Sequence, residues 1–174
     1  AAKRLTWSSV DTAVPKIAVD SSGGLHVVWH SSGPYAIYYK TSADGGEIWT
    51  PGRRLTWNPG NSGWPAIAVD SSDNLHVVWN DDMLGNAEIF YKKSTNSGVA
   101  WTTDQRITWT SDYSESAAIA VDSSENLHVL WWDYTPGNCE IFYKSSSDVG
   151  VTWMPGRTLT WNSGDSRNPA IAVC

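Results

Sequence analysis

The sequence predicts an all-β protein built from a repeated unit of four short antiparallel strands. The tetrapeptide RLTW, or a close variant of it, ends at Trp7, Trp57, Trp109 and Trp161, so it recurs every 50 to 52 residues. A longer block, IAVDSSxxLHVVW, starts at residues 17 and 67 and returns with small changes at residue 119. No stretch shows the 3.6-residue period of a helix over the ten or so positions that a helix needs. The chain is therefore one motif repeated.

Each unit contains four strand-like runs separated by turn-forming clusters. In the second unit the runs cover residues 67–69, 75–79, 88–92 and 106–109, and they are rich in Ile, Val, Tyr, Phe, Trp and Thr. Such runs between clusters of Ser, Asn, Asp, Gly and Pro favour short strands. Four strands in about 50 residues are typical of one blade of a β-propeller. A solenoid of sheets is the alternative.

The faces of these strands indicate how the blades pack. The second and third strands are apolar on both faces, which is typical of a sheet covered on both sides. The first strand carries small residues suited to a crowded axis. The fourth strand alternates, with Leu55 and Trp57 on one face, which suits an outer edge.

Counting strands gives three complete blades plus one orphan strand at each end, a fourth strand at residues 4–7 and a first strand at 171–173. We expect a single repeat domain over 1–174, with units near 1–52, 53–104 and 105–156 and a partial unit at 157–174. Propellers generally close with four to eight blades. We therefore expect either a homo-oligomer or the remainder of a larger propeller as the partner.

An octapeptide of the form S-x-D-x-G-x-x-W lies between the third and fourth strands of every unit. Its marked positions are Ser42, Asp44, Gly46, Trp49, Ser94, Asn96, Gly98, Trp101, Ser146, Asp148, Gly150 and Trp153. The pattern resembles the Asp box, or BNR repeat, of sialidase-like β-propellers, and the resemblance covers essentially the whole chain. The middle copy departs from it, because Asn96 stands where the other copies have Asp.

This resemblance implies a structural role for the octapeptide. The Asp side chain can accept hydrogen bonds within its own turn, the Gly can adopt a positive φ, and the Trp can fill the gap between sheets. In the related families the box lies on the face away from the active site. We expect it to bind no metal.

Sialidase catalysis is the first activity that the resemblance implies. It requires three Arg on the substrate carboxylate, a Tyr–Glu pair and an Asp acid/base. The recurrent Arg4, Arg54, Arg106 and Arg157 belong to the predicted outer strand and cannot converge there. The F/Y-R-I-P signature is also missing. We expect no catalytic residues in this chain, and a fragment of a larger sialidase-like glycoside hydrolase stays open as an alternative.

Other polar residues recur once per unit. His26, His76 and His128 fall on the second strand, where the ring would hold them apart, so we expect them to pack between blades and not to share a metal. Asp20, Asp70 and Asp122 open the turns that precede those strands. Lys40, Lys92 and Lys144 end the third strand, where we expect them to be solvated.

The loops that differ between units supply the candidate ligand-binding residues. These loops join the fourth strand to the next first strand, and the second strand to the third. Aromatic rings beside carboxylates suit sugars, so a glycan or a protein partner is the candidate ligand. A ligand-free repeat scaffold that assembles into an oligomeric propeller is a further alternative. The candidates are Trp64, Tyr113, Trp132, Tyr134, Asp82, Asp133 and Arg167.

Composition excludes several classes of function. The formal net charge is −6 and the basic residues are scattered, so we expect neither a nucleic-acid nor a membrane partner. Cys139 and Cys174 make neither a disulfide framework nor a zinc site, and we expect no cofactor. Residues 1–12 contain no signal peptide, although the resemblance favours secretion. Ten of the 12 Trp fall at repeated positions, which predicts a structural role for those ten.

Overall fold

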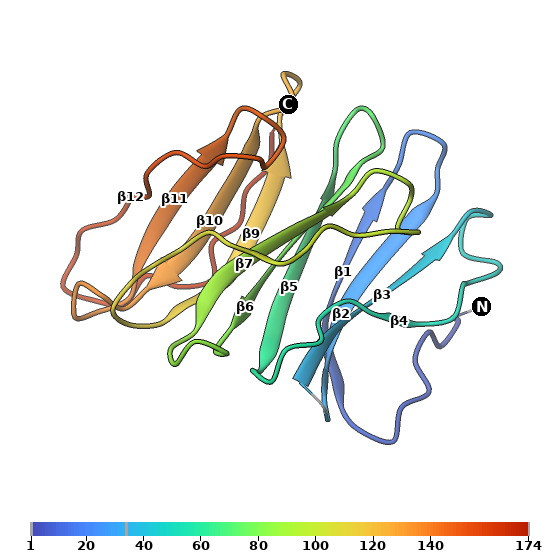
Figure 1. Ribbon diagram of the computed structural model, residues 1–174, viewed down its shortest axis with the longest axis horizontal. Helices are drawn as coiled ribbons and strands as arrows, with labels where there is room; N and C mark the ends of the chain where they lie inside the picture. Colours follow the sequence, from blue (N-terminus) through green and yellow to red (C-terminus); the bar gives the residue numbers. More distant parts are fainter. Residues whose placement is uncertain (1, 34, 174) are drawn as a thin grey trace.

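The computed structural model describes residues 2–33 and 35–173. It contains three four-stranded antiparallel sheets that lie side by side, coloured blue, green and orange in Figure 1. The first sheet contains β1 (Thr12–Val19), β2 (Leu25–Ser32), β3 (Tyr35–Ser42) and β4 (Arg53–Arg54). The second contains β5 (Ser62–Val69), β6 (Leu75–Asp81), β7 (Glu88–Ser94) and β8 (Gln105–Arg106). The third contains β9 (Ser114–Val121), β10 (Leu127–Asp133), β11 (Glu140–Ser146) and β12 (Arg157–Thr158). The predicted all-β class and four-stranded unit are confirmed.

The first strand of each sheet is longer than the three residues predicted. β1, β5 and β9 each have eight residues, because the second half of the preceding loop also pairs with the neighbouring strand. Each strand contains a β-bulge, for example between Gly63 and Ala66 in β5. β5 contacts both β1 and β9, so these strands form one side of the three-sheet array.

The fourth strand of each sheet is shorter than predicted. β4, β8 and β12 have two residues each and start one residue before the aligned Arg or Thr of the tetrapeptide. The ladder stops because the hydroxyl of the following Thr takes the next donor: Thr56 Oγ1 accepts a hydrogen bond from Ile37 N (3.0 Å), and Thr108 Oγ1 accepts one from Ile89 N (2.8 Å). A side chain thus replaces a backbone acceptor.

The predicted orphan strands are not confirmed. Within the described part of the chain, residues 4–7 and 171–173 form no strand. The reason is that a strand needs a hydrogen-bonded neighbour, and neither segment has one. None of the described residues forms a helix that could cross a membrane.

Two apolar clusters lie between consecutive sheets. One joins the first and second sheets through residues such as Val28, Ile37 and Trp79, and the other joins the second and third through Val78, Ile89 and Trp131. The second sheet is thus covered on both sides, as its continuous apolar runs predicted.

A repeated polar joint also connects each sheet to the next. The His76 ring lies between Asp70 Oδ2 (3.1 Å from Nε2) and the Tyr91 hydroxyl (2.9 Å from Nδ1), and that hydroxyl donates to Val149 O of the third sheet (3.4 Å). The first sheet repeats this with Asp20, His26 and Tyr39, whose hydroxyl donates to Ser97 O. Burial raises the pKa of Tyr39 to about 12, so the hydroxyl remains a donor. The histidines therefore pack between blades, as predicted.

The lysines that end the third strands are buried, so their predicted solvation is wrong. Lys92 Nζ donates to Leu55 O of the preceding unit (2.7 Å), and Lys144 Nζ donates to Ile107 O (2.5 Å). Lys40 makes the same bond to Leu5 O (2.8 Å). In each case a backbone carbonyl in the fourth segment of the preceding unit accepts a hydrogen bond from the lysine ammonium. This bond replaces one to water.

The octapeptides fold as compact turns. They lie at the end of each sheet where the Tyr39 and Tyr91 hydroxyls reach the neighbouring unit. Asp44 Oδ1 accepts hydrogen bonds from Ser42 Oγ (2.7 Å) and Ile48 N (2.8 Å), and Asn96 Oδ1 does the same with Ser94 and Ala100. Gly98 has φ +82°, and a Cβ there would overlap the Tyr39 ring. Trp101 packs edge-on against Tyr39 with ring centroids 5.3 Å apart. The Trp therefore fills the gap between sheets.

Replacing Tyr91 by Phe tests the joint. The variant leaves Nδ1 of fully buried His76 without a partner, and we expect a loss of about 1–3 kcal/mol in the free energy of unfolding in urea. Tyr143→Phe is the matched control, since His128 and Tyr143 of the third sheet are half-buried and water can replace the hydroxyl. Equal losses in the two variants would contradict the account.

Candidate functional site

The variable loops gather at one end of the three sheets. Cα pairs at this end join the start of each first strand to the end of its second strand: Thr12 with Ser31, Ser62 with Asp81, and Ser114 with Asp133. The octapeptide turns lie at the opposite end, beyond Ser42, Ser94 and Ser146. The two predicted loop sets thus share one surface, which we call the loop end.

The bulge of each first strand lies near the loop end and has an unusual backbone. Val14, Trp64 and Ser116 occupy equivalent positions and have φ values of +52°, +45° and +54°. Asn168 occupies the equivalent position of the partial fourth unit and also has a positive φ, +54°, although it lies outside the strands of the described residues. Positive φ is costly for branched and bulky residues and is common where a bulge redirects a side chain. Trp64, expected in a loop, therefore lies within β5, where the bulge leaves it 45% exposed.

A cavity of about 340 Å³ opens at the loop end beside Trp64. Its aromatic wall includes Trp64, Tyr113 and Tyr35, and the Trp64 and His30 rings are 5.5 Å apart. Its polar wall includes Asn80, Asp82 and Glu115. We call it the loop cavity. Trp64 also lines an inner groove of about 510 Å³ between the first strands, so this residue borders both spaces.

One residue that lines the loop cavity has a buried polar atom without a partner. Asn80 is 5% exposed, and its Oδ1 accepts no hydrogen bond from any of the described residues. A buried acceptor without a donor costs free energy, and such atoms are rare in folded proteins. A hydroxyl or amide of a bound molecule would satisfy it.

Two titratable groups beside this atom are shifted by burial. Burial lowers the pKa of His30, so its imidazole is neutral at pH 7. The Trp64 backbone N–H donates to His30 Nδ1 (3.3 Å), which leaves the Nε2–H of the neutral ring as a donor. Burial raises the pKa of Glu115, and the charge of Arg167 opposes that shift. The cavity therefore has a neutral ring on one sheet and a partly desolvated carboxyl on another.

Three of the predicted ligand residues, Trp64, Tyr113 and Asp82, line the loop cavity. Asp82 is held by Asn61, whose backbone N and side-chain Nδ2 donate to its two oxygens (2.7 and 2.8 Å). The fixed carboxylate presents its remaining lone pairs to the cavity.

The other four predicted residues lie elsewhere. Trp132, expected in a loop, ends β10 and is 8% exposed beneath the Arg167 guanidinium, 4.9 Å from the ring. Asp133 is fully buried, because Ser114 Oγ (2.7 Å) and Thr135 N (2.9 Å) donate to it. Tyr134 is exposed and joins Tyr113 through the backbone only. The Trp132 ring is therefore covered by Arg167, and the Asp133 carboxylate is occupied by donors of its own sheet and the following turn.

Sequence reasoning missed His30, Asn80 and Glu115. A signal was present: His30, Asn80 and Trp132 occupy one repeat position, and Gly63, Glu115 and Arg167 another. Both positions vary strongly although the residues just before them repeat, as Trp29, Trp79 and Trp131 and as Ser62, Ser114 and Ser166. Variation between internal copies, combined with strand register, would have pointed to this cavity.

Cys139 is buried in the third sheet and burial raises the pKa of its thiol, whereas Cys174 lies outside the described residues. Within residues 2–33 and 35–173, no three His, Cys, Asp or Glu side chains form a metal-binding group.

No protein-family model and no curated protein sequence matches this chain. Solved structures do match it. A Hadza microbial sialidase superposes with a TM-score of 0.65 and 16% identity, covering 82% of this chain and 36% of its own. An α-L-arabinofuranosidase of Fusarium graminearum, in complex with an iminosugar inhibitor, gives 0.70 and 13%, covering 84% and 48%. An α-L-arabinanase of Penicillium chrysogenum, complexed with arabinobiose, gives 0.67 and 15%, covering 90% and 52%.

The chain has a β-propeller fold. At these identities the likeness establishes the fold alone. The chain spans about one third to one half of the length of these structures.

Replacing Glu115 by Gln tests the electrostatics of the loop cavity. The folded-state pKa is raised above the unfolded value, so ionised Glu115 opposes folding at pH 7 and has no such effect once protonated. We expect Glu115→Gln to raise the unfolding temperature slightly at pH 7 and to match the parent below pH 4. Glu47→Gln, at an exposed residue, is the control. A lower unfolding temperature at pH 7 would mean that attraction to Arg167 outweighs burial.

Proposed function

We propose that this chain is a noncatalytic Asp-box propeller module that binds glycans in the loop cavity. The observation that carries the proposal is the unpaired, buried Oδ1 of Asn80, a residue that lines a cavity with an aromatic wall. A sugar has C–H faces that stack on aromatic rings and hydroxyls that donate to buried acceptors. One ligand class therefore accounts for both halves of the lining.

The cavity residues fit specific parts of a sugar. Trp64 offers a ring face that the bulge holds half-exposed, and Asn80 accepts one hydroxyl proton. His30, neutral at pH 7 with Nδ1 bonded to the Trp64 N–H, can donate its Nε2–H to a sugar oxygen, and Asp82 can accept further hydroxyls from a position fixed by Asn61. Preorganised groups reduce the entropy lost on binding.

A noncatalytic role is supported by where the recurrent arginines lie. The Arg54 guanidinium stacks over Trp57 on the outer edge, and Arg106 pairs with Glu88 there (2.5 Å). Arg167, expected as the one arginine of the variable loops, stacks on Trp132 and pairs with Asp165. The Asp-box assignment is supported by the Ser–Asp–Gly–Trp bonding, which repeats with Asn96 in place of Asp.

A second candidate is a fragment of a larger glycoside hydrolase. It is favoured by the fold neighbours, which are sialidases and arabinan-active hydrolases and extend well beyond the region matched by this chain. In that case the catalytic groups would come from further blades. Release of reducing sugar by a longer natural chain, with the same cavity occupied, would favour this candidate.

Sugar titrations of the isolated chain test the main proposal. We expect arabinobiose, xylotriose or 3′-sialyllactose to bind without being hydrolysed, as measured by calorimetry and by product analysis. Trp64→Ala and Asn80→Ala should each weaken binding by at least about tenfold, through lost stacking and a lost hydroxyl partner. Asn80→Ala should unfold at the parent's urea midpoint, because Oδ1 has no bond to lose. Unchanged affinity in both variants, or binding of none of the three sugars, would overturn the proposal.

We further propose that a second copy of this chain covers the outer face of the third sheet. Val78, Ile89 and Ile107 are fully buried against the third sheet, whereas the equivalent Leu130 and Ile141 are half-buried and Leu159 is 41% exposed. At the other end of the array, Ile17 and Val19 are more than half exposed, although the equivalent Ile67 and Ile119 are buried. The two ends of the array thus expose two different apolar faces. Two different faces can meet in a head-to-tail contact between copies of the chain.

Light scattering tests this contact. We expect a mass of at least twice 19.1 kDa at micromolar concentration. Leu159→Glu should shift the chain to monomer, because the contact would bury an unpaired charge. Leu84→Glu, at an exposed residue of the loop end, should leave the mass unchanged. A monomeric parent with cooperative unfolding would contradict the proposal.

A further inference from the structure

Four tryptophans that the repeat predicts to be structural are the most exposed aromatic residues of the fold. Trp7, Trp57, Trp109 and Trp161, the rim tryptophans, are 74%, 75%, 67% and 78% exposed. Trp57 and Trp109 lie in segments flanked by complete sheets on both sides, so their exposure does not come from the chain ends. Single exposed aromatics are ordinary, but four at one repeat position are a property of the unit.

Folding of the outer segment depends on the residues before each rim tryptophan. Leu55 and Ile107 are buried in the clusters between sheets. Thr56 and Thr108 accept the backbone donors of Ile37 and Ile89. The indole therefore contributes little to packing, and its removal should leave the fold intact.

A cation holds one face of the ring at three of these positions. The Arg54 guanidinium is 4.7 Å from the Trp57 centroid, Lys144 Nζ is 5.4 Å from that of Trp109, and Lys40 Nζ is 5.6 Å from that of Trp7. The cations are fixed in turn, since Arg54 Nε donates to Thr56 O (2.5 Å) and the two lysines donate to backbone carbonyls. The Trp7 and Trp57 rings are thus each ordered against one cation, and the Trp109 ring against two, because the Arg106 guanidinium is also 5.8 Å from its centroid. Most of each ring stays open to solvent.

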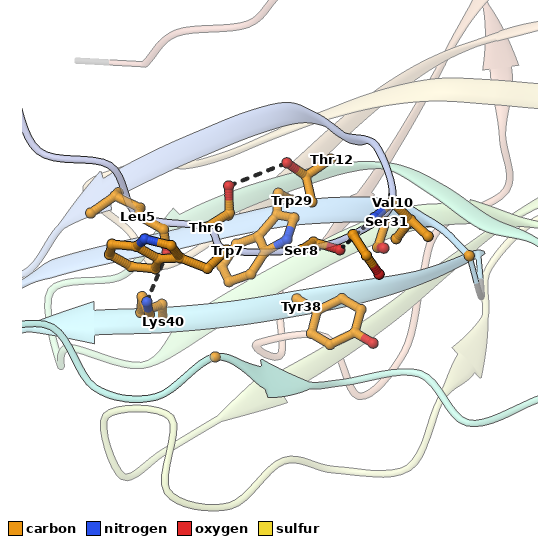
Figure 2. A pocket seen from close by; sticks show the side chains of 13 residues that line it. Leu5, Thr6, Trp7, Ser8, Val10, Thr12, Trp29, Ser31, Tyr38 and Lys40 are labelled. Carbon is orange, nitrogen blue, oxygen red and sulfur yellow. Dashed lines mark hydrogen bonds between the residues drawn. The ribbon is translucent and has the colours of Figure 1, made fainter.

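Polar hollows adjoin the two terminal rim tryptophans. Figure 2 shows the hollow beside Trp7, where Trp29 and Lys40 lie close to the indole and Tyr38 and the Ser8 and Ser31 side chains lie farther along; its volume is about 380 Å³. The hollow beside Trp161, about 430 Å³, is lined by Asn138, Glu140 and Asn162. Both combine an open indole with hydroxyl, amide or carboxylate groups, as the loop cavity does.

We propose that the rim tryptophans form a second, multivalent surface that binds a polysaccharide chain. The repeat favours a polymer as the ligand: an exposed indole recurs once per unit at the same repeat position, and a ligand with repeating units can engage several of these rings together. Linked weak sites gain about 10²–10⁴ in overall affinity without any new contact. The inference takes its ligand class from the proposed function, but it assigns different residues and predicts dependence on ligand length.

Affinity electrophoresis of the parent chain in gels containing soluble arabinan, xylan or polysialic acid tests the surface. We expect at least one polymer to retard the chain. The double variant Trp57→Ala, Trp109→Ala should weaken this retention by at least about tenfold while keeping the parent's urea midpoint and its affinity for arabinobiose, xylotriose and 3′-sialyllactose. The matched variant Trp57→Phe, Trp109→Phe should retain most of the polymer binding, because the ring face remains.

Trp64→Ala separates the two surfaces, since it should lose the short sugars and keep polymer retention. Retention of the double alanine variant equal to that of the parent, or no retention of the parent by any polymer, would overturn this inference and leave the loop cavity untouched. A fall in light-scattering mass in the double alanine variant, without loss of polymer retention, would instead assign the rim to self-association.

Discussion

The joint between consecutive sheets is the interaction on which the rest of the structure depends. A Tyr hydroxyl and a Lys ammonium cross from one unit to backbone carbonyls of another. The receiving side therefore supplies its acceptors from the backbone, and it needs a particular residue only at Gly98 and Gly150, where a Cβ would overlap the tyrosine. Backbone acceptors are present in any sequence, which lets the other positions of the unit vary. The apolar clusters supply most of the burial between sheets, and the polar joint fixes their register.

The residues that hold the sheets together repeat, so the residues that differ between units lie at the loop end, away from the octapeptide turns. The joint, the turns and the buried Trp79 and Trp131 use residues that repeat almost unchanged. Positions near the bulge change from Val14 to Trp64 to Ser116, while the backbone keeps a positive φ at each. The strained backbone conformation is thus common to all units, whereas the side chain at this position differs from one unit to the next.

The sequence was sufficient to predict the four-stranded unit, because apolar runs between turn clusters depend on local chemistry alone. It failed where one unit meets another. Lys92 appears solvated in isolation and is buried because a carbonyl of the preceding segment reaches it. Trp132 appears free in a loop and is covered by Arg167, 35 residues away in the chain. The repeat predicts a structural role for Trp57. Its side chain is exposed, because the Thr56 hydroxyl ends the backbone pairing with the third strand one residue before it. Contacts between units are not encoded in the local pattern.

The central claim is that ligand chemistry lies at the loop end and the rim, and that the octapeptide end is structural. The 12 indole N–H groups are natural reporters of this division. Titration of ¹⁵N-labelled chain with arabinobiose, xylotriose and 3′-sialyllactose, followed by indole N–H shifts, tests it directly. The account predicts that binding shifts the Trp64 resonance and leaves those of Trp49, Trp101 and Trp153 in place. Shifts confined to the three octapeptide tryptophans would contradict it.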